Sequence, residues 1–124
     1  MKFGSIAGIV LPGKKLASTL GFPTLNLQPP ALLEIASGVY ACLVDIDRQT
    51  YQGIMNLGYS PTFQGKILRL EIHVFDFNQD CYGKKVIVTP KIFIRPEQKF
   101  SAIDQLKSQI KADIILAKSY FLEQ

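Results

Sequence analysis

The side chains of Thr24 and Asn26 form the first pair in this chain that could hold a cation beside a phosphate. They lie in the segment Gly-Phe-Pro-Thr-Leu-Asn-Leu at residues 21–27, where Pro23 favours extended backbone. In an extended segment the two polar side chains share one face, and the leucines share the other. Hydroxyl and amide oxygens suit Mg²⁺, which takes few protein ligands and fills its other positions with phosphates and water. The alternative is an edge strand that ends in a turn, since Pro and Asn are ordinary turn residues.

An alternating stretch at residues 67–77 carries a carboxylate that could accept a proton. Apolar residues alternate there with polar ones, so we expect a strand with Leu70 and Ile72 facing inward and Glu71 facing outward. A carboxylate is a weak base for an alcohol, yet it aids phosphoryl transfer when it orients the hydroxyl within hydrogen-bond distance. The alternative for Glu71 is a solvated face. For His73, the single histidine of the chain, we expect a structural or supporting role.

Residues 8–15, Gly-Ile-Val-Leu-Pro-Gly-Lys-Lys, nearly spell a phosphate-binding P-loop. A P-loop needs Ser or Thr at its last position to contact Mg²⁺, and a helix must follow it. This chain has Lys15 at that position and no helical pattern after it. We therefore reject a P-loop.

The segment at residues 21–27 resembles the Gly-Phe-Pro-Thr-Ala-Asn-Leu signature of the riboflavin kinase (flavokinase) family. Further blocks follow in that family's order: Gly38–Ala41; Gly53–Gly58 with Pro61–Phe63; Glu71–Phe77 with Tyr82–Lys84; and Ile94–Phe100 with Leu106, Gln109, Ile110 and Asp113. Each block alone is weak. Together, in order over residues 6–113, they identify the chain as a member of the family.

The resemblance implies a kinase that transfers the γ-phosphate of ATP to the 5′-hydroxyl of riboflavin and yields FMN and ADP. It assigns Glu71 as the general base, and Thr24 and Asn26 as the residues that hold Mg²⁺ and phosphates. A flap that begins at Gly13 would cover ATP. Further ATP or phosphate contacts implied by the resemblance come from Gly13, Lys14, Lys15 and Asn56. The alternative for the two lysines is solvent exposure.

The resemblance also implies an apolar cleft for the flavin ring beside the segment that follows the last strand. The flavin contacts that we expect from it are Tyr82, Arg95, Glu97, Phe100 and Leu106. Two alternatives remain open at this point. Arg95 and Glu97 could form a structural ion pair, and the apolar residues could belong to the core.

The chain departs from the family pattern at two places. Bacterial members usually carry Gly-Arg shortly before the signature, where this chain has Ala17-Ser18. Losing Gly restricts the backbone of the flap, and losing Arg removes a phosphate contact. Leu25 replaces the usual Ala. These changes motivate the alternative of a non-catalytic, regulatory flavin- or nucleotide-binding module, whereas the retained Thr24, Asn26 and Glu71 favour an active kinase.

The composition of the chain limits which other classes of protein it could belong to. The chain has 124 residues, 48% hydrophobic and 19% charged, with a net charge of +4, which suits a folded domain with an anionic ligand. Its lysines do not form a basic run, so we expect no nucleic-acid partner, although a basic RNA-binding barrel is a rival. With a single histidine, the chain contains no histidine-rich adenylyltransferase motif. No segment reads as a signal peptide or membrane span, and we expect a cytoplasmic monomer.

Strand signals separated by turn residues occupy most of the chain. We expect strands at about 3–11, 38–47, 50–58, 67–76 and 85–94, a hairpin turn near Asp47-Arg48-Gln49, and a loop at 28–37. Apolar residues then recur every three or four positions, which predicts a helix over about 101–122 with Ser101 as its N-cap. We expect the two cysteines to be buried thiols. The resulting fold class is all-β, and the resemblance makes it a six-stranded antiparallel Greek-key barrel. The barrel (about 3–95) and its helix would form one domain over 1–124.

Overall fold

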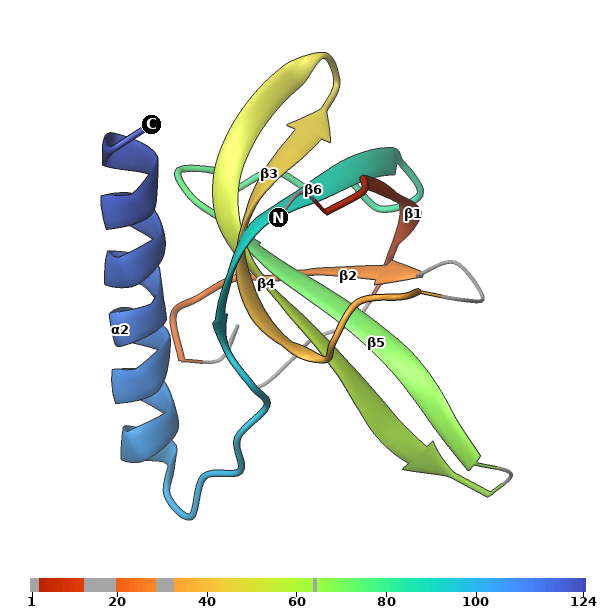
Figure 1. The fold of residues 1–124 in the computed structure, drawn as a ribbon. Coiled ribbons are helices and arrows are strands. Elements are labelled where there is room, and N and C mark those ends of the chain that lie inside the picture. The colour runs from red at the N-terminus through yellow and green to blue at the C-terminus, as the bar shows by residue number, and fades with distance from the viewer. Residues whose placement is uncertain (1–2, 13–19, 29–32, 64) are drawn as a thin grey trace.

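The computed structural model of the chain describes residues 3–12, 20–28, 33–63 and 65–124 (Figure 1). The predicted flap, with Gly13, Lys14 and Lys15, lies outside the described residues. The Ala17-Ser18 departure lies outside them as well.

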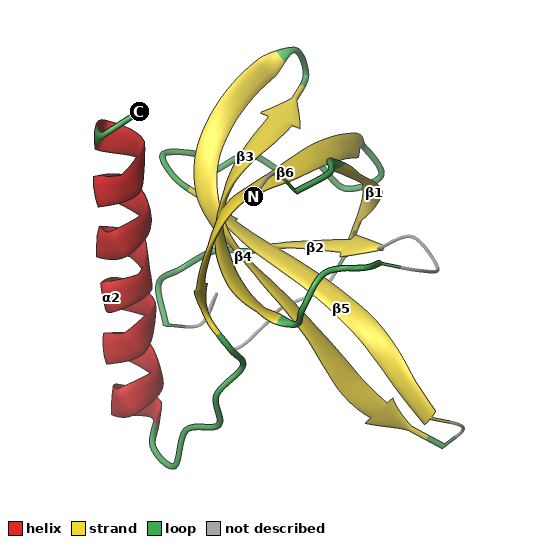
Figure 2. Ribbon diagram, in the orientation of Figure 1, coloured by secondary structure: helices red, strands yellow, loops and turns green. Residues whose placement is uncertain are grey.

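The strands form a closed barrel in the order β1-β2-β5-β4-β3-β6, and every neighbouring pair is antiparallel (Figure 2). Their bounds are β1 Ile6–Leu11, β2 Leu25–Gln28, β3 Gly38–Ile46, β4 Gln49–Thr62, β5 Gly65–Val74 and β6 Lys85–Arg95. Strands β3, β4 and β5 follow one another as hairpins, and β6 returns beside β3, which is a Greek key. Closure gives every strand two neighbours and removes exposed sheet edges. The predicted six-stranded antiparallel barrel is confirmed.

The barrel interior is filled by the apolar residues of alternating strand positions. In β5, Leu70, Ile72 and Val74 are buried in this interior cluster, as the alternation at residues 67–77 predicts. The cluster also contains both cysteines, Cys42 and Cys81, as buried free thiols. The interior therefore follows directly from the period of two that strands impose on side-chain direction.

Helix α2, Ile103–Leu122, lies against the outer wall of the barrel (Figure 1). Its Ile110 and Ala117 join Val39, Ala41 and Ile54 in a second buried cluster. Strand β3 is consequently buried on both faces along most of its length. The predicted helix is confirmed to within two residues of its start.

The predicted N-cap of this helix is wrong. The N-cap residue is Ala102, which has no side-chain cap, and the hydroxyl of Ser101 lies 3.0 Å from Oε1 of Gln105 instead. Ser101 is one position too early for its oxygen to accept from the first free backbone N–H groups.

The turn between β3 and β4 follows the prediction, whereas β4 and β5 extend beyond their predicted ranges. Asp47 and Arg48 both have positive φ, 49° and 69°, which is the backbone that a two-residue type I′ hairpin turn requires. This hairpin turn lies where the sequence predicts it. Strands β4 and β5, by contrast, continue to Thr62 and start at Gly65, beyond the predicted limits at about 58 and 67, and their pairing includes Pro61 opposite Lys66. Within the described part of the chain, no helix has the length and apolar character that a bilayer crossing needs.

Candidate functional site

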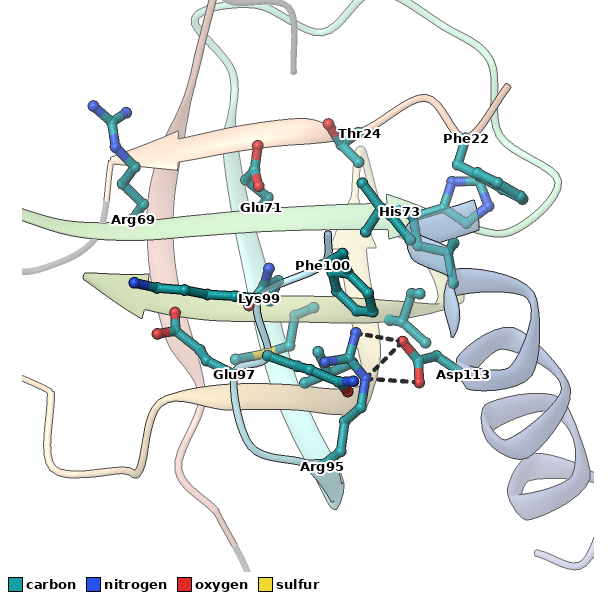
Figure 3. A pocket seen from close by; sticks show the side chains of 17 residues that line it. Phe22, Thr24, Arg69, Glu71, His73, Arg95, Glu97, Lys99, Phe100 and Asp113 are labelled. Carbon is teal, nitrogen blue, oxygen red and sulfur yellow. Dashed lines mark hydrogen bonds and ion pairs between the residues drawn. The ribbon is translucent and has the colours of Figure 1, made fainter. Parts of the chain in front are cut away.

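A cavity of about 710 Å³ opens on the outer wall of the barrel, between β4, β5, the segment that follows β6, and α2 (Figure 3). Its lining mixes apolar and charged side chains. They are Phe22, Thr24, Val39, Ile54, Met55, Asn56, Arg69, Glu71, His73, Arg95, Glu97, Gln98, Lys99, Phe100, Leu106, Ile110 and Asp113. This volume falls in the range of about 300–1,000 Å³ that is usual for small-molecule sites.

Strand register brings the predicted polar residues together. Glu71 on β5 is paired with Asn26 on β2 at one side and with Asn56 on β4 at the other. Directly opposed residues of antiparallel strands point to the same face, with Cβ atoms about 4.5–5.5 Å apart. The residues in the next row, Leu27 and Leu70, face the interior. The register therefore places two carboxamides beside the candidate base on the outer wall.

The same row continues across the barrel wall to Arg95. Asn56 is paired with Val39 on β3, and Val39 is paired with Arg95 on β6. Three strand spacings separate Glu71 from Arg95, or about 14 Å along the wall. In Figure 3 the two residues lie at opposite ends of the cavity, with Phe100 between them. The aromatic ring of Phe100 thus lies between two ends of the cavity that carry polar groups.

Glu71 is half-buried, and its Oε1 atom has almost no contact with solvent. Arg69 and His73 stand on the same strand and the same face, to either side of it (Figure 3). The carboxylate is therefore partly screened from water and still borders the cavity. A base that orients a hydroxyl needs this placement.

Thr24 lines this cavity and also a second one, of about 340 Å³, on its other side. The second cavity is bordered by Pro23, Leu25 and residues of the loop that precedes β6. Tyr82, a predicted flavin contact, lines this second cavity and is 56% exposed. Asn26 is half-buried beside Glu71 but is not among the residues that line the larger cavity. Thr24 is thus the residue that the two cavities share.

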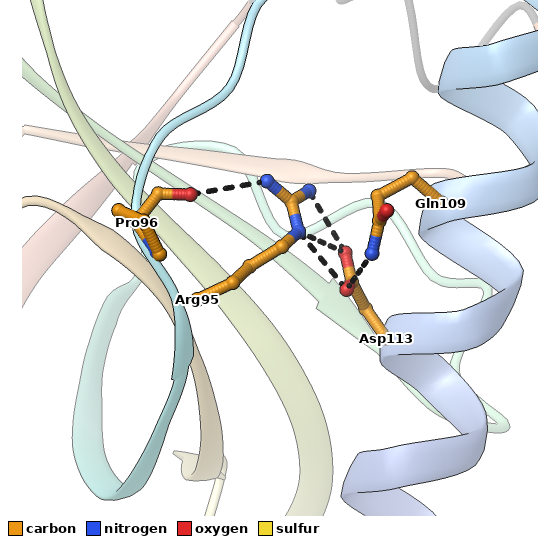
Figure 4. Close-up of polar contacts among 4 residues, drawn as sticks. All are labelled: Arg95, Pro96, Gln109 and Asp113. Carbon is orange, nitrogen blue, oxygen red and sulfur yellow. Dashed lines mark hydrogen bonds and ion pairs between the residues drawn. The ribbon is translucent and has the colours of Figure 1, made fainter.

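Arg95 forms an ion pair with Asp113 of α2, in place of the Arg95–Glu97 pair that the sequence left open. Its Nε lies 3.0 and 3.1 Å from the two carboxylate oxygens of Asp113, and its Nη2 lies 2.9 Å from Oδ2 (Figure 4). Gln109 donates from Nε2 to Oδ1 of Asp113 at 3.0 Å. The ring of Phe100 lies 5.8 Å from the guanidinium carbon of Arg95, within cation–π range.

Glu97 occupies space that Gly58 leaves open on β4. A Cβ atom added at Gly58 would lie 1.7 Å from Oε1 of Glu97. The segment after β6 therefore folds back over β4, which brings Glu97, Lys99 and Phe100 to the cavity.

His73 fixes the backbone just before Thr24. Its Nδ1 lies 2.7 Å from the carbonyl oxygen of Pro23, so Nδ1 must carry the proton and donate. Its ring also meets Phe22 and Phe75 edge-on, at 5.9 and 5.7 Å between centroids. These contacts fit the supporting role that we predict for His73.

Sequence reasoning missed several lining residues, including Phe22, Arg69, Lys99 and Asp113. Asp113 had a signal in the sequence, since it is a lone acidic residue on the apolar face of the helix between Ile110 and Ala117. A buried charge on such a face normally has a partner. Arg69 and Lys99 had no comparable signal.

The oxygen ligands present suit a magnesium ion that is held mainly by a nucleotide. Among the described residues, no group of three or more His, Cys, Asp or Glu could hold a metal ion. Thr24 and Asn26 offer hydroxyl and amide oxygens, and Mg²⁺ commonly takes one or two protein ligands together with phosphates and water. The donor set therefore fits Mg²⁺ delivered with its phosphates, and it does not fit a site built from carboxylates and histidines.

Comparison with known proteins relates this chain to flavin phosphorylation. Residues 2–121 match the model of the flavokinase (riboflavin kinase) family. The chain is 42% identical over 120 residues to a trifunctional protein RibF/MnmA of Mycoplasmoides gallisepticum, covering 96% of this chain and 18% of that protein. It is 41% identical to a bifunctional riboflavin kinase/FMN adenylyltransferase of Haemophilus influenzae, covering 94% and 38%.

Two further relatives extend this comparison. An RNA-binding riboflavin kinase RibR of Bacillus subtilis is 40% identical, with 88% of this chain and 47% of that protein covered. A crystal structure described as a macrolide-efflux protein from Streptococcus pneumoniae superposes with a TM-score of 0.86 and 39% identity, covering 92% of this chain and 38% of that one. The chain therefore spans between about a fifth and a half of the length of these relatives.

Proposed function

Since the chain belongs to the riboflavin kinase family, we propose that it transfers the γ-phosphate of ATP to the 5′-hydroxyl of riboflavin, giving FMN and ADP. The observation that carries this proposal is the position of Glu71. Its carboxylate borders a cavity with apolar and charged walls, lies in register with two carboxamides, and shares that cavity with Thr24, which also borders a second cavity. A phosphoryl transfer needs an acceptor and a donor that meet at a base.

The larger cavity is the acceptor site in this proposal. Its apolar lining includes Phe22, Ile54, Phe100 and Leu106, which suit a flat, mostly apolar ring. The sugar-like chain of riboflavin then runs along the wall toward Glu71. Glu71 orients the 5′-hydroxyl and accepts its proton as the phosphorus–oxygen bond forms, which is mainly a positioning role.

The donor approaches from the other side of Thr24. We assign the smaller cavity to the nucleotide, and with it Tyr82, which the resemblance first assigned to the flavin. The hydroxyl of Thr24 and the amide of Asn26 hold the phosphates and Mg²⁺ at the boundary between the two cavities. When bound, magnesium neutralises charge on the phosphate oxygens.

The test of the proposed function is product formation. The purified chain is incubated with riboflavin, ATP and Mg²⁺, and flavins and nucleotides are separated by chromatography. The proposal predicts FMN and ADP in equal amounts and no FMN without ATP. Riboflavin binding without FMN would point to the non-catalytic module, and no flavin binding would overturn the proposal.

Thr24→Ala tests the boundary between the two sites. Removing the hydroxyl should raise the KM for MgATP by about tenfold, the size expected for one lost hydrogen bond to a charged group. The KM for riboflavin should change much less, because the apolar walls remain. Steady-state kinetics with each substrate varied in turn gives both values, and an equal rise in both would contradict the assignment.

A further inference from the structure

Asp113 is a buried carboxylate on the face of α2 that packs against the barrel. Its side chain is 2% exposed, and its helical neighbours on that face, Ile110 and Ala117, belong to the apolar cluster beneath the helix. An ionised carboxylate is expensive to bury unless it is paired and hydrogen-bonded. Asp113 meets that condition through Arg95 and Gln109.

The ion pair holds the guanidinium of Arg95 by one edge. Nε and Nη2 face the carboxylate of Asp113, while Nη1 donates to the carbonyl oxygen of Pro96 at 3.3 Å (Figure 4). A guanidinium has five N–H donors. Among the contacts of the described residues, this leaves one N–H on each terminal nitrogen for other acceptors. Arg95 lines the cavity with 16% of its side chain exposed.

The pair also sets the charge at this end of the cavity. Asp113 balances the charge of Arg95, so the guanidinium can offer hydrogen bonds without an uncompensated positive charge. The ring of Phe100 lies beside it. Because Arg95 and Asp113 neutralise each other, an uncharged ring that carries polar atoms fits this end better than an anion does.

We propose that Asp113, supported by Gln109, is a positioning residue for the acceptor: it fixes Arg95 so that the free guanidinium N–H groups meet polar atoms of an uncharged acceptor ring. This inference rests on the proposed function, because the acceptor is riboflavin there. Helix α2 then contributes to acceptor binding through Asp113, which acts by holding Arg95 and does not touch the acceptor's reacting hydroxyl.

A purely structural role for the pair makes a different prediction. A buried ion pair can often be replaced by apolar residues without loss of stability. If the pair only anchored α2, weakening it would reduce the folded fraction, which lowers kcat and leaves both KM values unchanged. A positioning role raises the KM for riboflavin while the KM for ATP stays the same.

The first test is Asp113→Asn, with Asp104→Asn on the same helix as the matched control. Asp104 is exposed in the first turn of α2 and does not line the larger cavity. We expect Asp113→Asn to raise the KM and the dissociation constant for riboflavin by about tenfold or more, the effect of one misplaced charge-assisted hydrogen bond. The KM for ATP and both riboflavin constants of the control should match the wild type.

The second test is the double variant Arg95→Met with Asp113→Leu, which removes the pair and keeps an apolar contact, so it guards against a single variant that fails to fold. We expect it to fold and to bind riboflavin as weakly as Asp113→Asn or more weakly. Wild-type riboflavin binding in the folded double variant, or in folded Asp113→Asn, would overturn the inference alone. Failure of the wild-type chain to bind riboflavin would overturn the proposed function, and this inference with it.

Discussion

The two faces of β5 differ in what they determine. Leu70 and Ile72 face the closed barrel interior and are fully buried, whereas Glu71 and His73, between and after them in sequence, face the cavity under α2. The interior is complete within the barrel itself. The outer face forms a cavity only because three segments cover it, namely the chain before β2, the chain after β6, and α2. Adjacent residues can therefore serve stability and function separately.

The largest expected effect comes from the outer face. Glu71→Gln keeps the size of the side chain and removes its ability to accept a proton. We expect kcat for FMN formation to fall by about 10²–10⁴-fold, the usual contribution of a general base. Because the barrel interior is untouched, the free energy of unfolding measured in urea should change by less than about 1 kcal/mol. Full turnover in this variant would show that Glu71 is not the general base.

Leu70→Ala, one residue away, should show the opposite pattern. Deleting a fully buried leucine leaves a void in the barrel interior, and we expect the free energy of unfolding to fall by about 2–5 kcal/mol. The KM values of the molecules that remain folded should be unchanged. Urea denaturation and kinetics on the same preparation measure both quantities. Altered KM values with normal stability would contradict the separation of the two faces.

The interior also predicts a pH dependence. Burial raises the pKa of the Cys42 thiol above its ordinary value of 9.0. Above that value the unfolded thiol loses its proton while the folded one keeps it, so the free energy of unfolding should fall as pH rises. One such group contributes about 1.4 kcal/mol per pH unit. Denaturation at several pH values from roughly 9 to 11 should show a falling free energy of unfolding. In Cys42→Ala the fall should be less steep by about 1.4 kcal/mol per pH unit.

The smallest effect is expected at Gly58 of β4, for which Gly53 on the same strand serves as the control. At Gly58 an added Cβ meets only the flexible end of Glu97, whereas at Gly53 it meets the carbonyl oxygen of His73 at 2.5 Å. Gly58→Ala should thus displace Glu97 from the cavity edge, raise the KM for riboflavin by less than about tenfold, equivalent to about 1.4 kcal/mol, and leave stability unchanged. Gly53→Ala, the matched control, should lower thermal stability. The reverse pattern would show that the segment after β6 does not lie over β4 in solution.

The two faces also differ in how far the sequence predicts them. Alternation at residues 67–77 suffices to assign Leu70 to the interior, because the strand period alone sets side-chain direction. The row of Asn26, Glu71 and Asn56 depends on β2 lying beside β5, a pairing of residues 45 positions apart, which no local pattern encodes. The family resemblance supplied those residues, but it did not reveal that they form one row.

Long-range contacts also decide where Tyr82 and Arg95 lie. Tyr82 follows a family block that also contains Glu71, yet the turn before β6 takes it to the other side of Thr24. Arg95 has Glu97 near it in sequence, but α2 presents a buried carboxylate with better geometry. Spacing along the sequence suggests which residues are in contact, but the long-range packing of the fold determines which of those contacts form.

The most direct measurement of the central claim is a crystal structure of the chain with riboflavin and a non-hydrolysable ATP analogue with Mg²⁺. The account predicts the flavin ring in the larger cavity beside Phe100 and Arg95, the triphosphate at Thr24, and the ribityl 5′-hydroxyl about 2.6–3.2 Å from a carboxylate oxygen of Glu71. A flavin bound elsewhere on the barrel, or a 5′-hydroxyl out of reach of Glu71 with both substrates in place, would contradict it.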